Sequence, residues 1–371
     1  MNSRWIKLIG IALAAAAVSV ACSTEEGETS YKYFVYVANA GTGKISAFTM
    51  NSGSGSLKEI EGSPYAAGSE PVSVAADPTG QFLYATNYNS DSITAYAIDA
   101  VTGELTAVAG SPFTSGLGPH AITVEPTGKF AYVANAEGGT VWPYVIDPDT
   151  GALSAFSALA VLAGIHPSSL VTDPAGKFLY VASEYSGDVY AFAINASSGE
   201  LTAVPGSPFV TGGFPRSVAV DPAGKYAYAA NTASRNVSAF RIDAATGALA
   251  VIAGSPYAAG SGAGAVAVDP SGQFVYVANE DAGTVSAYTI NEDTGALTAV
   301  TGSPFAVGDA PGSIAVDPSG GFVFVTNYWS DGITAFSLTT TTGALTELSA
   351  SPYDVAEGGH PAAVVAIRIA Q

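Results

Sequence analysis

The sequence predicts an all-β fold: a seven-bladed β-propeller with four antiparallel strands in each blade. Three observations predict it: a fixed period, four short apolar runs in each period, and two chain ends that complete each other. The period is set by a Tyr-Val-x-Asn-like segment that recurs every 48 residues, beginning at Tyr36, Tyr84, Tyr132, Tyr180, Tyr228, Tyr276 and Phe324. A constant period of this length is typical of architectures in which one supersecondary unit stacks on its own copies.

The repeat that opens at Ala263 shows the four apolar runs of one period. The expected strands are residues 265–268, 274–279, 285–290 and 297–300. The tight-turn sequence Asp269-Pro270-Ser271-Gly272 separates the first two runs, and a turn at Asp293-Thr294-Gly295 separates the last two. Short strands joined by a few residues form an antiparallel meander, which is one blade of a propeller.

The two chain ends predict how the ring closes. The Tyr36 copy has no innermost strand before it, whereas residues 362–367 form an apolar run with nothing after it. Pairing these two segments completes the seventh blade and leaves no open sheet edge. The sequence has one cysteine, so no disulfide within the chain performs this closure.

Most repeated residues need only a structural role. An Asp-Pro-x-Gly turn recurs, and we expect each acid to bind backbone donors of its own turn. These acids are Asp77, Asp173, Asp221, Asp269 and Asp317, with Glu125 in the remaining copy. Each belongs to a different blade, so the sequence predicts neither a metal site nor a cofactor. One aromatic residue per period is expected to pack between blades: Phe48, Tyr96, Tyr144, Phe192, Phe240, Tyr288 and Phe336.

Residues 1–22 read as a secretory signal that ends at a lipobox-like cysteine. Arg4 and Lys7 precede the apolar run 8–18, and small residues lead to Cys22. The resemblance to a bacterial lipobox implies lipidation of Cys22, although Ser19 stands where leucine is usual. A soluble secreted protein cleaved nearby is the alternative. We therefore expect a signal at 1–22, a polar tether at 23–32 and the propeller at 33–371, with the protein exported and lipid-anchored to a bacterial membrane in the cell envelope.

The charge of the chain argues against nucleic acid as a partner. The formal net charge is −19, and removal of the signal leaves 10 basic against 31 acidic residues, a net charge of −21. Such a surface repels phosphate backbones and anionic lipid headgroups. We expect a monomer that meets the membrane only through its lipid.

Candidate functional residues gather on one face of the predicted ring. The loops between second and third strands, and those leading into the innermost strands, share a face and differ most between copies. All three histidines fall at the entry to innermost strands: His120, His166 and His360. Arg216 repeats the position of His120 two blades later, Glu184 and Glu280 occupy equivalent loop positions, and Arg235 lies slightly further along. The alternative is that these histidines only cap strands or fill the channel.

The repeat resembles the YVTN-type propellers, and its Ser-Pro-Phe, Gly-x-x-Pro and Asp-Pro-x-Gly segments are most similar to the lactonase family, which includes 6-phosphogluconolactonase and a carboxymuconate cyclase. The resemblance covers residues 33–369. It implies His120, Glu184 and Arg216 as catalytic residues. We expect four further residues on the same face to bind substrate: His166, Arg235, Glu280 and His360. Ser168 stands where the family leads us to expect an arginine.

The chemistry implied by the resemblance is the opening of a lactone. Glu184 or His120 would act as general base on the attacking water, and Arg216 would stabilise the oxyanion. The alternatives are an isomerase of the cyclase kind and a non-catalytic binding or scaffolding propeller that holds a protein or glycan ligand on the divergent face.

Overall fold

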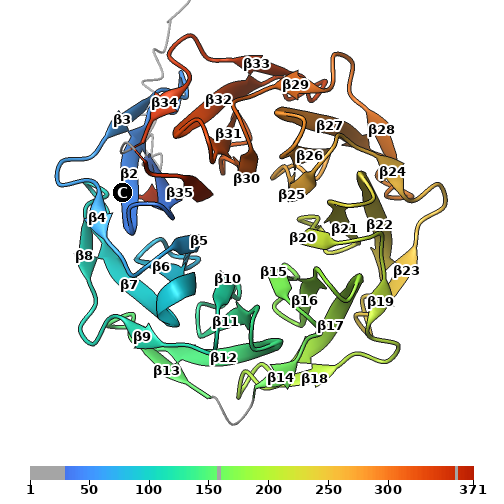
Figure 1. Ribbon diagram of the computed structural model, residues 1–371, viewed down its shortest axis with the longest axis horizontal. Helices are drawn as coiled ribbons and strands as arrows, with labels where there is room; N and C mark the ends of the chain where they lie inside the picture. The colour runs from blue at the N-terminus through green and yellow to red at the C-terminus, as the bar shows by residue number, and fades with distance from the viewer. Residues whose placement is uncertain (1–29, 157–159, 356–357) are drawn as a thin grey trace, which may run out of the picture.

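The computed structural model describes residues 30–156, 160–355 and 358–371, and it confirms the predicted ring of seven blades (Figure 1). Each blade is an antiparallel sheet. In six blades the strands run outward from the central channel in chain order, and in the seventh the last strand of the chain is innermost. The innermost strands are β5 (Pro71–Ala76), β10 (Pro119–Val124), β15 (Pro167–Thr172), β20 (Pro215–Val220), β25 (Ala263–Val268), β30 (Pro311–Val316) and β35 (Pro361–Ala370).

The second and third strands form the body of each blade. The second strands are β1 (Tyr31–Asn39), β6 (Phe82–Asn87), β11 (Phe130–Asn135), β16 (Phe178–Ser183), β21 (Tyr226–Asn231), β26 (Phe274–Asn279) and β31 (Phe322–Asn327). The third strands are β2 (Lys44–Met50), β7 (Ser92–Ile98), β12 (Thr140–Ile146), β17 (Asp188–Ile194), β22 (Asn236–Ile242), β27 (Thr284–Ile290) and β32 (Gly332–Leu338). A short 3-10 helix, η1 (Tyr88–Ser90), follows β6.

The outer edge of each blade carries two short strands where the sequence predicted one. The predicted fourth strands are β3 (Leu57–Glu59), β8 (Leu105–Ala107), β13 (Leu153–Ala155), β18 (Leu201–Ala203), β23 (Leu249–Val251), β28 (Leu297–Ala299) and β33 (Leu345–Glu347). A two-residue strand then pairs with the other end of the third strand: β4 (Tyr65–Ala66), β9 (Phe113–Thr114), β14 (Val161–Leu162), β19 (Phe209–Val210), β24 (Tyr257–Ala258), β29 (Phe305–Ala306) and β34 (Tyr353–Asp354). Together the two short strands cover one long edge, which limits pairing with other chains.

Ring closure follows the predicted scheme. β35 pairs antiparallel with β1, from Tyr31 opposite Ala370 to Asn39 opposite Pro361. The sheet of the seventh blade therefore has the order β3-β2-β1-β35 and joins both ends of the described chain. β1 begins at Tyr31, two residues before the predicted start of the propeller. The predicted signal, Cys22 and most of the tether lie outside the described residues.

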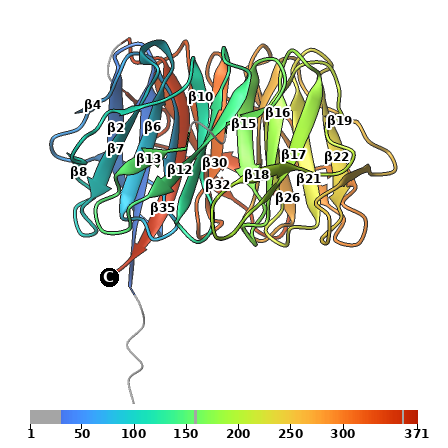
Figure 2. The same cartoon turned by 90° about the horizontal axis from the view of Figure 1, so that it is seen from below.

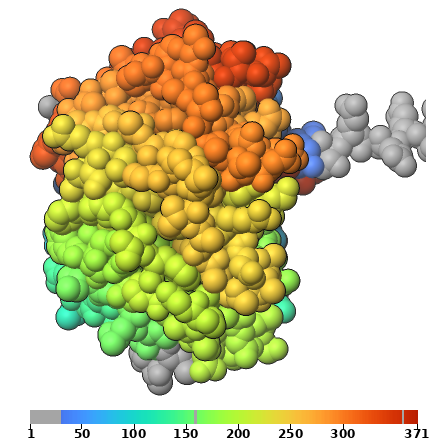
Figure 3. Space-filling model, turned by 90° about the vertical axis from the view of Figure 1, so that its right-hand side faces the viewer, coloured from blue at the N-terminus to red at the C-terminus, as the bar shows by residue number. Residues whose placement is uncertain are grey.

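The hydrophobic core lies between the blades. The second strand of each blade is buried along its whole length, except that β1 is buried only from Phe34 onward. Each core cluster combines side chains of adjacent blades. The repeated aromatic residue of the third strand belongs to these clusters, as expected: Tyr96, for example, packs with Phe34 and Ile45 of the preceding blade. Figure 3 shows the result from outside, where green, yellow and orange segments abut as one continuous wall. No helix in the described ranges is long and apolar enough to cross a membrane.

The tyrosine of the repeated segment ties each blade to the next. Tyr132 Oη, for example, donates a hydrogen bond of 3.0 Å to the carbonyl of Gly199, 67 residues later. Five other tyrosines make the equivalent bond: Tyr36, Tyr84, Tyr180, Tyr228 and Tyr276. Phe324 occupies the seventh position and has no hydroxyl. By the register of the ring, its acceptor would be the carbonyl of Gly55, whose neighbour across the blade interface is Phe322.

We expect the Phe324→Tyr variant to be more stable than the wild type by about 1 kcal/mol, because it adds the seventh buried hydrogen bond. The matched change, Tyr132→Phe, removes one bond, leaves the Gly199 carbonyl unpaired and should lower the free energy of unfolding by ~1 kcal/mol. Urea unfolding followed by circular dichroism measures both. If Tyr132→Phe were neutral, these bonds would not contribute to stability.

The two faces of the ring differ in construction. On one face, the repeated acids bind their own turns as predicted: Asp77 accepts from the amides of Thr79 and Phe82 at 3.0 and 2.6 Å, and Glu125 accepts from Thr127 at 2.7 Å. The C-terminal end of β35 and the start of β1 lie on this face (Figure 2). The innermost strands begin on the opposite face, which carries the divergent loops and the candidate site.

Candidate functional site

A β-bulge at the start of every innermost strand builds the site. In each blade the first residue of the strand pairs with the last residue of the second strand, the next residue is left out of the ladder, and pairing resumes after it, as at Pro119 and Ala121. A bulge re-aims the side chain of the unpaired residue. The seven unpaired residues are Val72, His120, Ser168, Arg216, Gly264, Gly312 and Ala362. All seven line one cavity of about 390 Å³ at the mouth of the channel.

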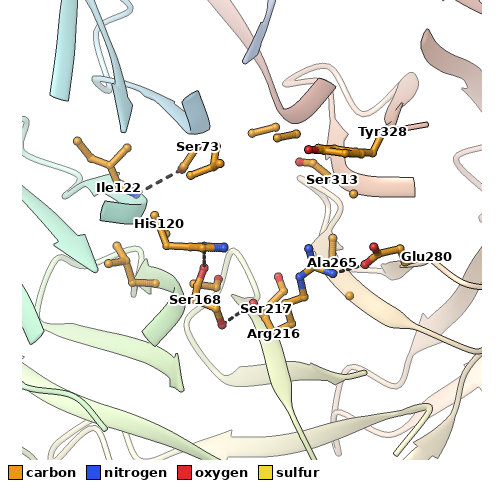
Figure 4. A pocket seen from close by; sticks show the side chains of 18 of the residues that line it. Ser73, His120, Ile122, Ser168, Arg216, Ser217, Ala265, Glu280, Ser313 and Tyr328 are labelled. Carbon is orange, nitrogen blue, oxygen red and sulfur yellow. Dashed lines mark hydrogen bonds and ion pairs between the residues drawn. The ribbon is translucent and has the colours of Figure 1, made fainter. Parts of the chain in front are cut away.

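The remaining walls of the cavity come from two other sets of residues. Deeper in the channel lie the residues that follow the bulges, among them Ser73, Ser169, Ser217 and Ser313. At the mouth lie Glu70, Glu280, Tyr328 and Trp329, which come from the divergent loops. Figure 4 shows His120 and Arg216 on adjoining sides of this space, with Glu280 and Tyr328 across from His120.

His120 is held as a neutral base. Its Nδ1 lies 2.8 Å from the carbonyl oxygen of Ser168, and because a carbonyl only accepts, Nδ1 carries the proton and Nε2 is left with a lone pair. Burial, together with the nearby charges of Arg216 and His166, lowers the pKa of His120 to about 4. The ring is half-buried and keeps surface towards the cavity.

Arg216 is paired with Glu280 inside the cavity. Its Nη1 donates to Glu280 Oε2, and about a third of each side chain stays exposed. The guanidinium has five N–H donors, so one bond to Glu280 fixes its orientation and leaves others for a ligand. Ser168 connects the two bulges, because its Oγ donates to the main-chain oxygen of Arg216 at 3.0 Å. The family resemblance implied an arginine at the position of Ser168, and the buried serine instead links His120 to Arg216.

Glu184 and His166 form a second pair beside the cavity. Glu184 Oε2 lies 3.1 Å from His166 Nδ1, an ion-pair distance at which the angles do not satisfy hydrogen-bond geometry. Burial raises the pKa of Glu184, but His166 and the charge of Arg216 outweigh it and leave that pKa below its usual value. The His166 ring stands 5.7 Å from the His120 ring. Neither Glu184 nor His166 lines the cavity, so this pair lies beside His120 and not within the cavity wall.

His360 belongs to an aromatic group at the mouth. Its ring stacks on Tyr328 at 5.0 Å between centroids, with Trp329 edge-on to both rings. Its Nδ1 lies 3.0 Å from the carbonyl oxygen of Tyr328, and its backbone amide donates to Asp331 Oδ1 at 2.8 Å. His360 therefore supports the cavity wall without lining it.

The structure gathers only some of the residues that the sequence singled out. His120, Arg216 and Glu280 line one cavity, Glu184, His166 and His360 lie next to it, and Arg235 is exposed outside the cavity lining. The roles given to these residues stay predictions. Glu70 is a lining residue that was not predicted, although it occupies the position of His166 two repeats earlier, directly before a proline. The serines were not predicted either, because their positions become notable only once the bulges are known.

No group of three or more His, Cys, Asp or Glu side chains within residues 30–156, 160–355 and 358–371 is arranged to hold a metal ion. The donor set of the cavity is one imidazole, one guanidinium, two carboxylates and several hydroxyls. These groups suit acid–base chemistry and hydrogen bonding to a small polar molecule.

The sequence matches one protein-family model over most of its length. The sequence model described as "Lactonase, 7-bladed beta-propeller" matches residues 28–116, 112–259 and 250–365. Among curated protein sequences, none matches this chain.

Several solved structures share the architecture. A candidate 6-phosphogluconolactonase of Bacteroides fragilis is 23% identical with a TM-score of 0.79, over 93% of this chain and 99% of that one. A second, from Bacteroides uniformis, is 22% identical with a TM-score of 0.79, over 90% and 99%. The periplasmic gluconolactonase PpgL of Pseudomonas aeruginosa is 21% identical with a TM-score of 0.76, over 91% and 98%. At these identities the likeness shows the fold.

Proposed function

Because this chain belongs to the lactonase family of seven-bladed β-propellers, we propose that it hydrolyses a cyclic ester at the mouth of its channel. One observation supports the proposal above all: a neutral His120 and the Arg216 guanidinium both line one cavity of about 390 Å³. A cavity of this size fits a small molecule. Family membership supplies the reaction class, and the cavity supplies a base and an oxyanion donor.

The proposed reaction uses His120 as general base. Nε2 removes a proton from a water molecule as the water oxygen attacks the lactone carbonyl carbon, and Arg216 N–H groups stabilise the oxyanion that forms. The ring C–O bond of the tetrahedral intermediate then breaks, and the leaving oxygen takes the proton from His120. The product is the open hydroxy acid, and His120 returns to its neutral form. The carbonyl oxygen of Ser168 holds the proton on Nδ1 of His120, so that Nε2 is the atom that takes up and releases a proton, and Glu280 positions Arg216.

Of the two bases that the sequence offered, the geometry favours His120 over Glu184. His120 lines the cavity, whereas Glu184 faces His166. We propose that the Glu184–His166 pair acts on His120 through its charge. A cyclase-type isomerase would use the same cavity, and product analysis of the same reactions distinguishes it from a hydrolase.

The test is a pH-stat screen of the signal-free protein against a panel of lactones, beside the His120→Ala variant. We expect turnover by the wild type and a loss of roughly 10²–10⁴-fold in the variant, the usual contribution of a general base. Absence of turnover on every lactone, with the ring intact by circular dichroism, would contradict the proposal.

The pH dependence gives a second check on His120. Its pKa of about 4 lies below the ordinary value of 6.5, so the base stays neutral as the pH falls and the acid limb of kcat/KM should have its midpoint near pH 4. Between pH 6.5 and 4 the unfolded chain binds more protons than the folded chain at this site, so His120 lowers the free energy of unfolding as the pH falls through this window. An acid limb near pH 6.5 would contradict the lowered pKa of His120.

We also propose that the protein is exported and held at a membrane by lipid on Cys22. The support is the lipobox-like sequence and the position of Tyr31, which begins β1 on the face opposite the cavity. An anchor attached before Tyr31 would therefore leave the cavity facing away from the membrane. Metabolic labelling with a radioactive fatty acid should mark the wild type and not the Cys22→Ala variant; equal labelling of both would refute lipidation at this residue.

A non-catalytic binding propeller is the second candidate, and one observation favours it. Large apolar side chains are exposed in the loops of the cavity face: Leu117, Ile165, Tyr185, Phe214 and Trp329. Exposed apolar groups on one face are typical of a surface that binds a partner. In that case, Tyr185→Ala and Phe214→Ala would weaken capture of a protein or glycan while His120→Ala would not.

A further inference from the structure

We propose that the cavity selects an uncharged cyclic polyol, that is, a sugar or sugar lactone without phosphate, and discriminates against the phosphorylated form. This inference rests on the proposed function in one respect: it places the ligand in the same cavity. Three features of the cavity carry it: the serine hydroxyls, the charges and the aromatic wall.

The serine hydroxyls of the cavity wall each keep a proton that no protein group accepts in the described ranges. Ser73 Oγ accepts the backbone amide of Ile122 in the next blade at 3.3 Å. Ser169, Ser217 and Ser313 accept equivalent amides at 3.2–3.3 Å. A hydroxyl that accepts an amide still has its own proton to donate. None of the four donates to a partner within the described ranges, and all four line the cavity, so they offer a set of donors to the oxygens of a polyol.

The charges around the cavity disfavour a phosphate. Arg216 is the only Lys or Arg among the described lining residues, and it is already paired with Glu280. Glu70 forms no ion pair within the described residues. Its Oε2 accepts a hydrogen bond from the neutral side-chain amide of Asn89. With His120 neutral, the lining groups sum to one cation and two carboxylates. A phosphate dianion is bound most strongly where cationic donors outnumber carboxylates, and here it would meet two carboxylates and a single guanidinium that is already paired with one of them.

The aromatic wall offers a flat apolar surface for a ring. Trp329 is 66% exposed, and Tyr328 is held against His360 by stacking. Both line the mouth of the cavity. A sugar has an apolar C–H face and polar edges, so it fits a site with aromatic rings on one side and hydroxyl donors on the other.

The test is a fluorescence titration of the signal-free protein with methyl β-D-glucoside and with glucose 6-phosphate, which differ in charge. The tryptophans are Trp5, within the predicted signal, Trp142 in β12 and Trp329. We expect the neutral glucoside to change the fluorescence and to bind roughly 10-fold more tightly than the phosphate, from like-charge repulsion at the cavity. The signal should disappear in Trp329→Phe and persist in Trp142→Phe. The double variant Glu70→Gln, Glu280→Gln should reduce the 10-fold preference for the glucoside over glucose 6-phosphate, because it removes both carboxylates of the cavity.

Each outcome of this experiment decides the proposal. The proposal would be overturned if glucose 6-phosphate bound as tightly as the glucoside or more tightly. It would also be overturned if neither sugar bound. Calorimetry would confirm the absence of binding, because a bound sugar ring could leave the fluorescence of Trp329 unchanged. The result is independent of turnover: neutral-sugar binding without hydrolysis would support this inference and contradict the lactonase proposal. Hydrolysis of a non-sugar or phosphorylated lactone without glucoside binding would support the lactonase proposal and contradict this inference.

Discussion

Deletion of residues 361–371 is expected to abolish cooperative folding of the ring. These residues include β35, the innermost strand of the seventh blade, which pairs along the whole of β1. The deletion exposes the partners of three buried side chains, Val364, Ile367 and Ile369. Each buried aliphatic side chain contributes about 1.5–3 kcal/mol, so the sum is comparable to the ~5–15 kcal/mol that stabilises a whole domain. Thermal unfolding followed by circular dichroism measures the effect.

The matched control for this deletion is removal of Gln371 alone. Gln371 is exposed, and its backbone amide donates to the carbonyl of Ser30 at 2.9 Å. Its loss should change the melting temperature by no more than a few degrees. If the longer deletion unfolded with the wild-type temperature and steepness, pairing of the two chain ends would not be what holds the ring closed.

The second large effect is expected from Arg216→Ala, which should reduce kcat on a lactone substrate by roughly 10²–10³-fold, as loss of an oxyanion donor does. Steady-state kinetics measure it. Arg216→Lys should recover only part of the loss, because an ammonium does not replace the planar fork of the guanidinium. Glu280→Gln should have a smaller effect, because its amide oxygen still accepts from Arg216.

Arg241→Ala is the matched control for this series, because Arg241 is exposed on β22, outside the cavity lining. It should retain wild-type kinetics. Arg235→Ala tests a prediction made from the sequence: a rise in KM would support substrate binding by Arg235 despite its exposed position. Full activity of a folded Arg216→Ala variant would contradict the proposed oxyanion role.

The candidate site was predictable only in part, and its residues show why. His120 and Arg216 could be found because they are rare residue types at equivalent repeat positions. Glu184 is in register with Glu280, yet only Glu280 lines the cavity. Its partner Arg216 reaches across from the adjacent blade, whereas the neighbour of Glu184 is His166. Side chains in equivalent positions thus took different partners because the residues opposite them differ.

The sequence alone determined the fold, the number of blades, the closure by the C-terminal strand and the face that carries the divergent loops. It did so because a fixed period places equivalent residues at equivalent positions around the ring, so that one repeat specifies all seven. Only the tertiary structure decided the cavity. The bulges bring seven residues that are separated by about 48 positions along the chain to the lining of one cavity: Val72, His120, Ser168, Arg216, Gly264, Gly312 and Ala362. Which of these residues touch, and which charges are already paired, depends on distances across that ring, and no spacing along the chain encodes them.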